Sequence, residues 1–209
     1  MMSGPFNANG RSRIAGTVTT PPSSASQAQV VDWRPGRSEA TLWNIVAIVL
    51  VVAGIPLFSL PAIIRSGKAG GSFQISLSDV LVIVILTAVL VVIHEAIHAL
   101  AMRALGARPT FGAVLVGGVM PALYATAAGH RFTRGQYLTI ALAPAVVISV
   151  LGFLACFGPW GGYLIVPPAI HLGGCVGDGF ATWKVLREPQ GTEFEDLRDG
   201  IRFYRKPQG

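Results

Sequence analysis

The run VLVIVILTAVLVVIHEAIHALAM, residues 80–102, is almost entirely apolar until two histidines and a glutamate near its end. At a rise of about 1.5 Å per residue, a helix over this run is roughly 34 Å long. The hydrocarbon core of a bilayer is about 30 Å thick and takes roughly 20 helical residues. The run therefore predicts a membrane-spanning helix that carries chemistry in its last third.

The composition of the whole chain points the same way. Of the 209 residues, 52% are hydrophobic and 12% are charged, with a mean hydropathy of +0.57. Soluble domains carry roughly 25% charged residues, so this chain is neither an ordinary soluble domain nor a disordered one. Its two cysteines lie in apolar runs and indicate no disulfide framework.

Three further apolar runs are long enough to cross a bilayer. Together with the first they predict four spans, at about 42–64, 80–102, 137–157 and 163–185. The last span contains prolines and glycines, which membrane helices tolerate where they line a cavity. We therefore expect an all-α membrane protein with about four transmembrane helices.

The basic residues orient these spans. If the N-terminus is cytoplasmic, 14 of the 16 Lys and Arg residues lie in cytoplasmic segments, as the positive-inside rule requires. The expected protein is multi-pass in the cell membrane, with both termini in the cytoplasm. Its net charge of +6 then reflects orientation in a lipid bilayer, and no nucleic-acid partner is expected.

Three regions follow from this pattern. Residues 1–40 are rich in Ser, Thr, Pro, Gln and Gly and are expected to form a disordered cytoplasmic tail. Residues 41–186 form the transmembrane domain, and residues 187–209 form a charged cytoplasmic tail, amphipathic or irregular. The stretch TFGAVLVGGVMPALYAT, residues 110–126, is too short for a span, and its central glycines favour a membrane-associated hairpin or re-entrant segment.

Two of the ten acidic residues, Glu95 and Asp178, lie inside the predicted spans. A carboxylate near the bilayer centre costs on the order of 2.5 to 3.5 kcal/mol, which makes such residues functional candidates. His94, Glu95 and His98 form the pattern H-E-x-x-H. Two histidines four residues apart share a helix face and can bind one metal, while the glutamate stands beside the attacking water as general base.

A catalytic zinc takes three protein ligands, and Asp178 is the candidate for the third. In the predicted topology the second and fourth spans run in the same direction. The histidine pair and Asp178 then both lie roughly 10 Å from the cytoplasmic ends of their helices. The alternative, an ion pair of Asp178 with Lys184 or Arg187, stays open.

His171 and Cys175 precede Asp178 on the same helix face. Since about 10 Å separate His171 from Asp178 on an intact helix, we expect His171 to donate a hydrogen bond to substrate or to the developing oxyanion. A structural histidine bonded across helices is the alternative. Cys175 is either a soft metal ligand or a small buried hydrophobe.

The sequence also resembles known families. HEAIHAL at the end of an apolar run and VGDGF near the end of the last run are similar to the site-2 protease-like intramembrane zinc metalloproteases. The resemblance implies that His94, His98 and Asp178 bind Zn²⁺ and that Glu95 activates water. Residues of about 80–205 resemble still more a small bacterial domain family of unknown function described as zincin-like membrane peptidases. The elements that match it are Arg134-Gly135-Gln136-Tyr137, Ala143-Pro144 and Gly177-Asp178, whereas His171 stands where that family has Asn.

These features predict a zinc-dependent intramembrane or membrane-proximal endopeptidase that hydrolyses peptide bonds of membrane protein substrates. The edge of the 110–126 segment could hold a locally unfolded substrate as an added strand. The alternative is a non-proteolytic metal-binding membrane protein, such as a sensor, a transporter or a pseudoprotease. Glu95 argues against it, because a site that only binds metal has no use for an unligated carboxylate. The sequence indicates no particular oligomeric state.

Overall fold

A computed structural model describes residues 29–67, 76–116, 118 and 120–206 of the chain. Three of its helices are long and apolar enough to cross a membrane, by length and composition: α1 (Arg37–Ser66), α2 (Leu77–Ala104) and α3 (Arg134–Ala155). They match three of the runs expected to span the membrane. Many apolar side chains on these helices face outward, such as Ile48, Val52 and Ile85. That exposure suits helices whose surroundings are lipid.

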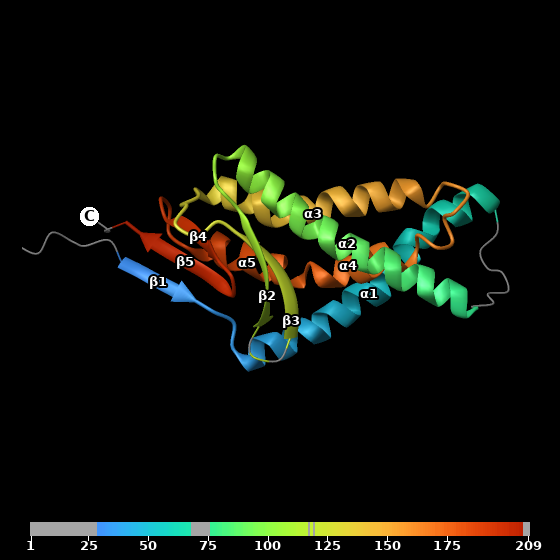
Figure 1. Cartoon of the computed structure of the whole chain (residues 1–209), viewed down its shortest axis with the longest axis horizontal. Helices are drawn as coiled ribbons and strands as arrows, with labels where there is room; N and C mark the ends of the chain where they lie inside the picture. Colours follow the sequence, from blue (N-terminus) through green and yellow to red (C-terminus); the bar gives the residue numbers. More distant parts are fainter. Residues whose placement is uncertain (1–28, 68–75, 117, 119, 207–209) are drawn as a thin grey trace, which may run out of the picture.

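The fourth expected span is two shorter helices, α4 (Val166–Gly174) and α5 (Val176–Arg187), which follow one another along the bundle (Figure 1). The start of α4 fits its sequence, because two prolines in the first turn need no N–H partner. The helix ends beside Cys175, within a glycine-rich stretch that has low helix propensity. Neither helix alone reaches the length of a span.

Close packing of α4 against α1 explains one of these glycines. A Cβ atom on Gly173 would lie 2.6 Å from Val51 and 2.8 Å from the carbonyl oxygen of Ala47 on α1. On the α1 side, Gly54 has the same relation to Ala169. Small residues at helix interfaces let membrane helices approach closely, so the glycines that weaken the helix also allow this contact.

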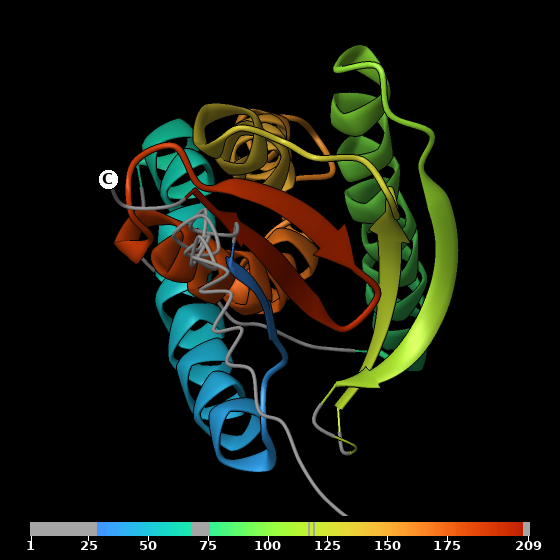
Figure 2. The same cartoon turned by 90° about the vertical axis from the view of Figure 1, so that its left-hand side faces the viewer.

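The expectation of an all-α fold is confirmed in part: the described residues are mostly helical but also form two small sheets. β1 (Gln29–Trp33), β4 (Glu193–Leu197) and β5 (Gly200–Arg205) form an antiparallel sheet in the order β1-β5-β4. This sheet packs at one end of the helical bundle (Figures 1 and 2). Residues 29–33, expected in a disordered tail, are therefore a strand, and α1 begins at Arg37; residues 1–28 lie outside the described part.

Alternation of apolar and polar side chains explains the strands of the C-terminal segment. Phe194, Ile201 and Phe203 point to one face and are at most 3% exposed, packed around Phe132 and Tyr137. The polar face carries the ion pair of Arg202 with Asp32, with a shortest distance of 2.6 Å. This pair joins β1 to β5 across the sheet.

The segment between α2 and α3 forms a second, two-stranded antiparallel sheet. β2 (Thr110–Val116) pairs with β3 (Met120–Thr126) in a register that runs from Thr110 opposite Thr126 to Val116 opposite Met120. Gly118, at the turn, has a φ of 75°, a conformation that favours glycine. The curved pair runs beside α2, and β3 contacts that helix (Figure 2). Its association with a membrane stays a prediction.

Candidate metal centre

The H-E-x-x-H residues lie on α2, about three turns before the helix ends. Spacing of four residues brings the His94 and His98 rings together, with centroids 4.7 Å apart and their Nε2 atoms separated by 3.0 Å. The side chains are 12% and 10% exposed. The Nε2 atoms of both histidines therefore point toward the same small, largely enclosed space.

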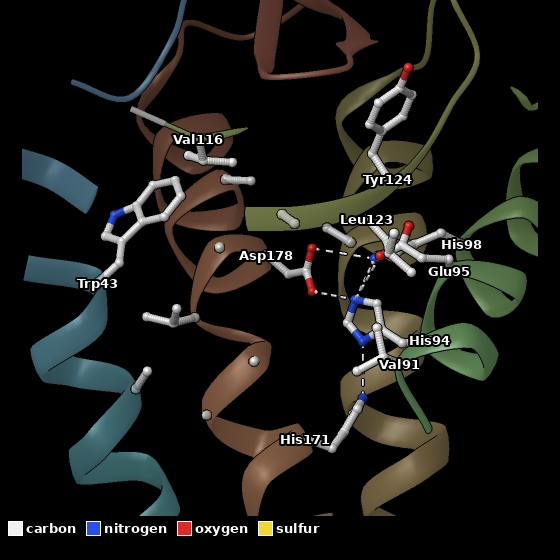
Figure 3. A pocket seen from close by; sticks show the side chains of 18 of the residues that line it. Trp43, Val91, His94, Glu95, His98, Val116, Leu123, Tyr124, His171 and Asp178 are labelled. Carbon is white, nitrogen blue, oxygen red and sulfur yellow. Dashed lines mark hydrogen bonds and ion pairs between the residues drawn. The ribbon is translucent and has the colours of Figure 1, made fainter. Parts of the chain in front are cut away.

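Asp178 reaches the same point from the first turn of α5, where the helix dipole favours a negative charge. Its Oδ2 lies 3.2 Å from Nε2 of His94, and its Oδ1 lies 3.3 Å from Nε2 of His98 (Figure 3). The short helix α5 thus brings to the site a residue that is 80 positions or more away from the histidines in the sequence.

The donor set fits zinc. Zn²⁺ in proteins takes imidazole nitrogen and carboxylate oxygen in a tetrahedral arrangement at about 2.0 to 2.2 Å, so its ligand atoms stand about 3.3 to 3.6 Å apart. The observed separations of 3.0, 3.2 and 3.3 Å are close to this value. Two neutral imidazoles and one carboxylate also leave a fourth position free for a water molecule, as in catalytic zinc sites.

Both histidines are oriented through their other ring nitrogen. Nδ1 of His98 lies 2.9 Å from the carbonyl oxygen of Ile140 on α3, and Nδ1 of His94 lies 3.0 Å from Nε2 of His171 on α4. Metal-binding histidines usually donate this second N–H to such a partner, which sets the tautomer and the ring orientation. A donor at Nδ1 of His94 requires Nε2 of His171 to be the acceptor.

His171 is thus bonded across helices, the alternative given above for this residue, and Cys175 is buried beside it. His171 is 5% exposed, and its Nε2 is engaged with His94 rather than free for a substrate. The thiol of Cys175 donates to the carbonyl oxygen of His171 at 3.3 Å, and its sulfur is almost equally far, 3.8 and 3.7 Å, from the two ring nitrogens. The sulfur therefore lies beside the ring and forms no short hydrogen bond with either ring nitrogen. It is still close enough to ring nitrogens of His94 and His171 for the three residues to form a possible metal-binding group.

Glu95 lies beside the cluster without joining the donor set. Its Oε1 is 4.0 Å from Nε2 of His94, and the side chain is 13% exposed. It shares one cavity of about 1090 Å³ with both α2 histidines, His171 and Asp178. The structure therefore brings together all five residues that the sequence singled out, and Figure 3 shows their side chains pointing toward one another.

The cavity also contains residues that the sequence analysis did not identify. Its walls include Trp43 on α1, Tyr124 on β3 and Tyr137 on α3, and β4 adds Asp196 and Leu197. Asp196 lies in a segment expected to be an amphipathic or irregular tail. The alternating pattern of residues 193–205 was the signal that could have placed a strand there.

One comparison with known proteins bears on this site. Residues 87–192, half of the chain, match the family described as "Putative zincin peptidase", a domain of unknown function numbered 3267. The matched stretch runs from within α2 to the residue before β4 and so includes both histidines, Glu95 and Asp178. No curated protein and no solved structure matches the chain. On this match, the chain belongs to the family described as "Putative zincin peptidase".

Proposed function

We propose that the protein is a zinc-dependent endopeptidase that cuts membrane proteins within the bilayer or at its edge, in the manner of site-2 protease-like enzymes. The family match suggests a metallopeptidase. The observation that carries the proposal is that the Nε2 atoms of His94 and His98 and the carboxylate oxygens of Asp178 lie within 3.3 Å of one another. Glu95 stands beside them as a carboxylate outside the donor set.

His94, His98 and Asp178 would hold the metal. When bound, zinc polarises the scissile carbonyl and makes a bound water more acidic. Glu95 accepts the proton of the attacking water and returns it to the leaving amine, the part of a general acid–base residue. His171 accepts the hydrogen bond of His94 and keeps its Nε2 aimed at Asp178, so we assign it a positioning role in place of a contact to the oxyanion.

The pairing of β1 with β5 supports four membrane crossings. β1 precedes α1 and β5 follows α5, yet the two strands lie side by side in one sheet. Three crossings would leave them on opposite sides of a membrane, whereas four leave them on the same side. We therefore assign the fourth crossing to α4 and α5 together, and the side of the sheet to the cytoplasm by the positive-inside rule.

The substrate must present an extended backbone, because the carbonyl groups of an intact helix are already hydrogen-bonded. The sheet of β2 and β3 has two strands, so among the described residues each strand has one edge that pairs with no other strand. Residues of both strands line the cavity beside Glu95. Addition of a substrate strand to this sheet would place its backbone near the metal ligands.

The alternative is a membrane protein that binds metal without proteolysis. The experiment compares wild type, Glu95→Gln and His98→Ala, each purified in detergent without chelators, for zinc content and for cleavage of labelled single-span substrates. Glu193→Gln, a surface carboxylate paired with Arg131, is the matched control.

Zinc in wild type and Glu95→Gln, its loss in His98→Ala, and cleavage by wild type and the control alone would support the peptidase. Equal cleavage by Glu95→Gln would refute the role of Glu95. A wild-type protein without zinc would refute the metal site itself.

A further inference from the structure

One carboxylate in the cavity plays no part in the metal centre. Asp196 reaches the cavity from β4, together with its neighbour Leu197. The hydroxyl of Tyr137 donates to Oδ1 of Asp196 at 3.1 Å, and the hydroxyl of Thr126 donates to its main-chain carbonyl at 2.6 Å. These bonds hold the residue against α3 and the end of β3.

The neighbouring carboxylate, Glu195, is a useful contrast. Strand alternation turns it to the other face of β4, where it accepts hydrogen bonds from Tyr204 and from the main-chain N–H of Gly129. Arg202 lies 3.7 Å from its Oε2 and balances its charge. Glu195 is therefore a compensated structural acid and does not line the cavity.

Asp196 has no such compensation. Among the described residues, no Lys or Arg forms an ion pair with it, and none lines the cavity. Glu95 and Asp178 belong to the catalytic cluster, which leaves Asp196 as the one acidic residue lining this cavity, among the described residues, without an assigned role. Burial raises the pKa of Asp196 to about 7, against the lowering effect of the hydrogen bond from Tyr137. A cation beside it would remove this cost.

The position of Asp196 relates it to the metal centre. Its partner Tyr137 lies one helical turn, about 5 Å, before Ile140 on α3. The carbonyl oxygen of Ile140 is the group that orients His98. Asp196 is thus displaced from the metal ligands toward the sheet, which packs at one end of the bundle (Figure 1). The helix ends that carry Arg103 (last turn of α2), Arg134 (start of α3) and Lys184 (last turn of α5) lie on the same side of the predicted membrane.

We propose that Asp196 forms a cation-binding subsite that receives a Lys or Arg side chain of the substrate. Membrane proteins carry an excess of Lys and Arg beside the cytoplasmic ends of their helices, so a substrate with the same orientation presents such a residue at this depth. The inference rests on the proposed function and extends it: the enzyme selects substrates with a basic residue on the cytoplasmic side of the scissile bond.

The test uses full-length protein in detergent and pairs of single-span peptides. One peptide of each pair carries Arg at a position scanned along the cytoplasmic side of the span, and the other carries citrulline, its neutral near-isostere. The proteins are wild type, Asp196→Asn, which keeps an acceptor for Tyr137, and the matched control Glu195→Gln. The readout is the ratio of the kcat/KM values for the two peptides, measured on one protein preparation. A lower fraction of folded protein reduces both values equally and leaves their ratio unchanged.

We expect wild type and Glu195→Gln to prefer the Arg peptide at least tenfold at one position or more, and Asp196→Asn to bring the ratio close to one. A wild-type ratio near one, or a preference that Asp196→Asn retains, would overturn the subsite. The latter result would leave Asp196 as a structural acid that fixes β4 to Tyr137.

Binding of the same peptides to Glu95→Gln proteins, measured by fluorescence anisotropy, separates the subsite from the reaction. In one outcome, binding prefers Arg over citrulline only when Asp196 is present, and the zinc-loaded wild type cleaves no peptide. This outcome supports the subsite and refutes the peptidase. Cleavage of both peptides at equal rates with equal binding supports the peptidase and refutes the subsite.

Discussion

Replacing His171 by alanine is expected to weaken zinc binding while the fold persists. Zinc at Nε2 of His94 requires the ring proton on Nδ1, and that N–H donates to Nε2 of His171 at 3.0 Å. The substitution removes the acceptor and leaves the N–H in an enclosed space. His94 also loses the contact that keeps Nε2 aimed at Asp178.

The structure sets the size of the effect. A buried donor left without a partner costs about 1 to 3 kcal/mol, and about 1.4 kcal/mol corresponds to a tenfold change in Kd. The zinc Kd should therefore rise by roughly 5- to 150-fold. Because the side chain of His94 is 12% exposed, water can replace part of the lost bond, and we expect about tenfold, the lower end of the range for outer partners of metal-binding histidines.

The assay is competition of the purified protein with a chelator of known zinc affinity. Cys175→Ala is the matched control, because its thiol touches His171 without contacting a metal ligand. His171→Gln offers an amide oxygen as acceptor and should recover part of the affinity. Thermal unfolding of the zinc-free proteins reports any loss of fold.

Three results would refute the reasoning. They are an unchanged Kd in His171→Ala, an equal loss in Cys175→Ala, and a loss in His171→Ala that follows the thermal stability of the zinc-free protein instead of the presence of an acceptor at position 171.

Three further predictions concern the fold and the ligands. Asp178→Asn, which keeps the shape and loses the charge, should lower zinc content in detergent-purified protein to a small fraction of wild type; full occupancy would remove Asp178 from the ligand set. Gly173→Ala should destabilise the packing of α1 on α4 by about 1 to 3 kcal/mol, the usual cost of overpacking, whereas a Cβ on Gly174 meets nothing within 4 Å and should leave thermal unfolding almost unchanged. Burial would raise the pKa of Glu195, but hydrogen bonds from Tyr204 and Gly129 hold this pKa below its usual range. The stabilisation from the ionised carboxylate is therefore present at neutral pH and is lost as the pH falls through the lowered pKa. Glu195→Gln should flatten this acid dependence of the unfolding free energy, and an unchanged dependence would contradict the prediction.

The sequence indicates which residues form the candidate site, and the structure brings them together. The four-residue spacing of His94 and His98 places both rings on one face of any helix, whatever surrounds it. Asp178 stood out because a carboxylate in an apolar run is costly. For His171 the sequence left two alternatives, a contact to substrate or oxyanion and a bond across helices. It could not name the partner, because His94 is 77 residues away and the contact depends on how α4 crosses α2.

The fold was predicted less well where the chain leaves the helices. β1 and β5 are 170 residues apart and are strands only because each supplies the other's hydrogen bonds. Gln29–Trp33 has no local pattern that announces such a partner, so the segment reads as part of a polar tail. Residues 193–205 differ, because their alternation of apolar and polar side chains favours a strand. The partners still come from elsewhere in the chain: Phe194 is fully buried against Phe132, in the loop before α3, and Tyr137, on α3.

The sequence by itself determined the apolar helices, the spacing of the two histidines and the residue types of the donor set. These properties depend on hydropathy and on the 3.6-residue period, both of which are local. Only the tertiary structure decided that α5 brings Asp178 to the histidines, that Ile140 and His171 orient them, and that β4 places Asp196 in the same cavity. Each of these contacts joins segments far apart in the chain, and the energy that selects them comes from packing, which no short stretch of sequence contains.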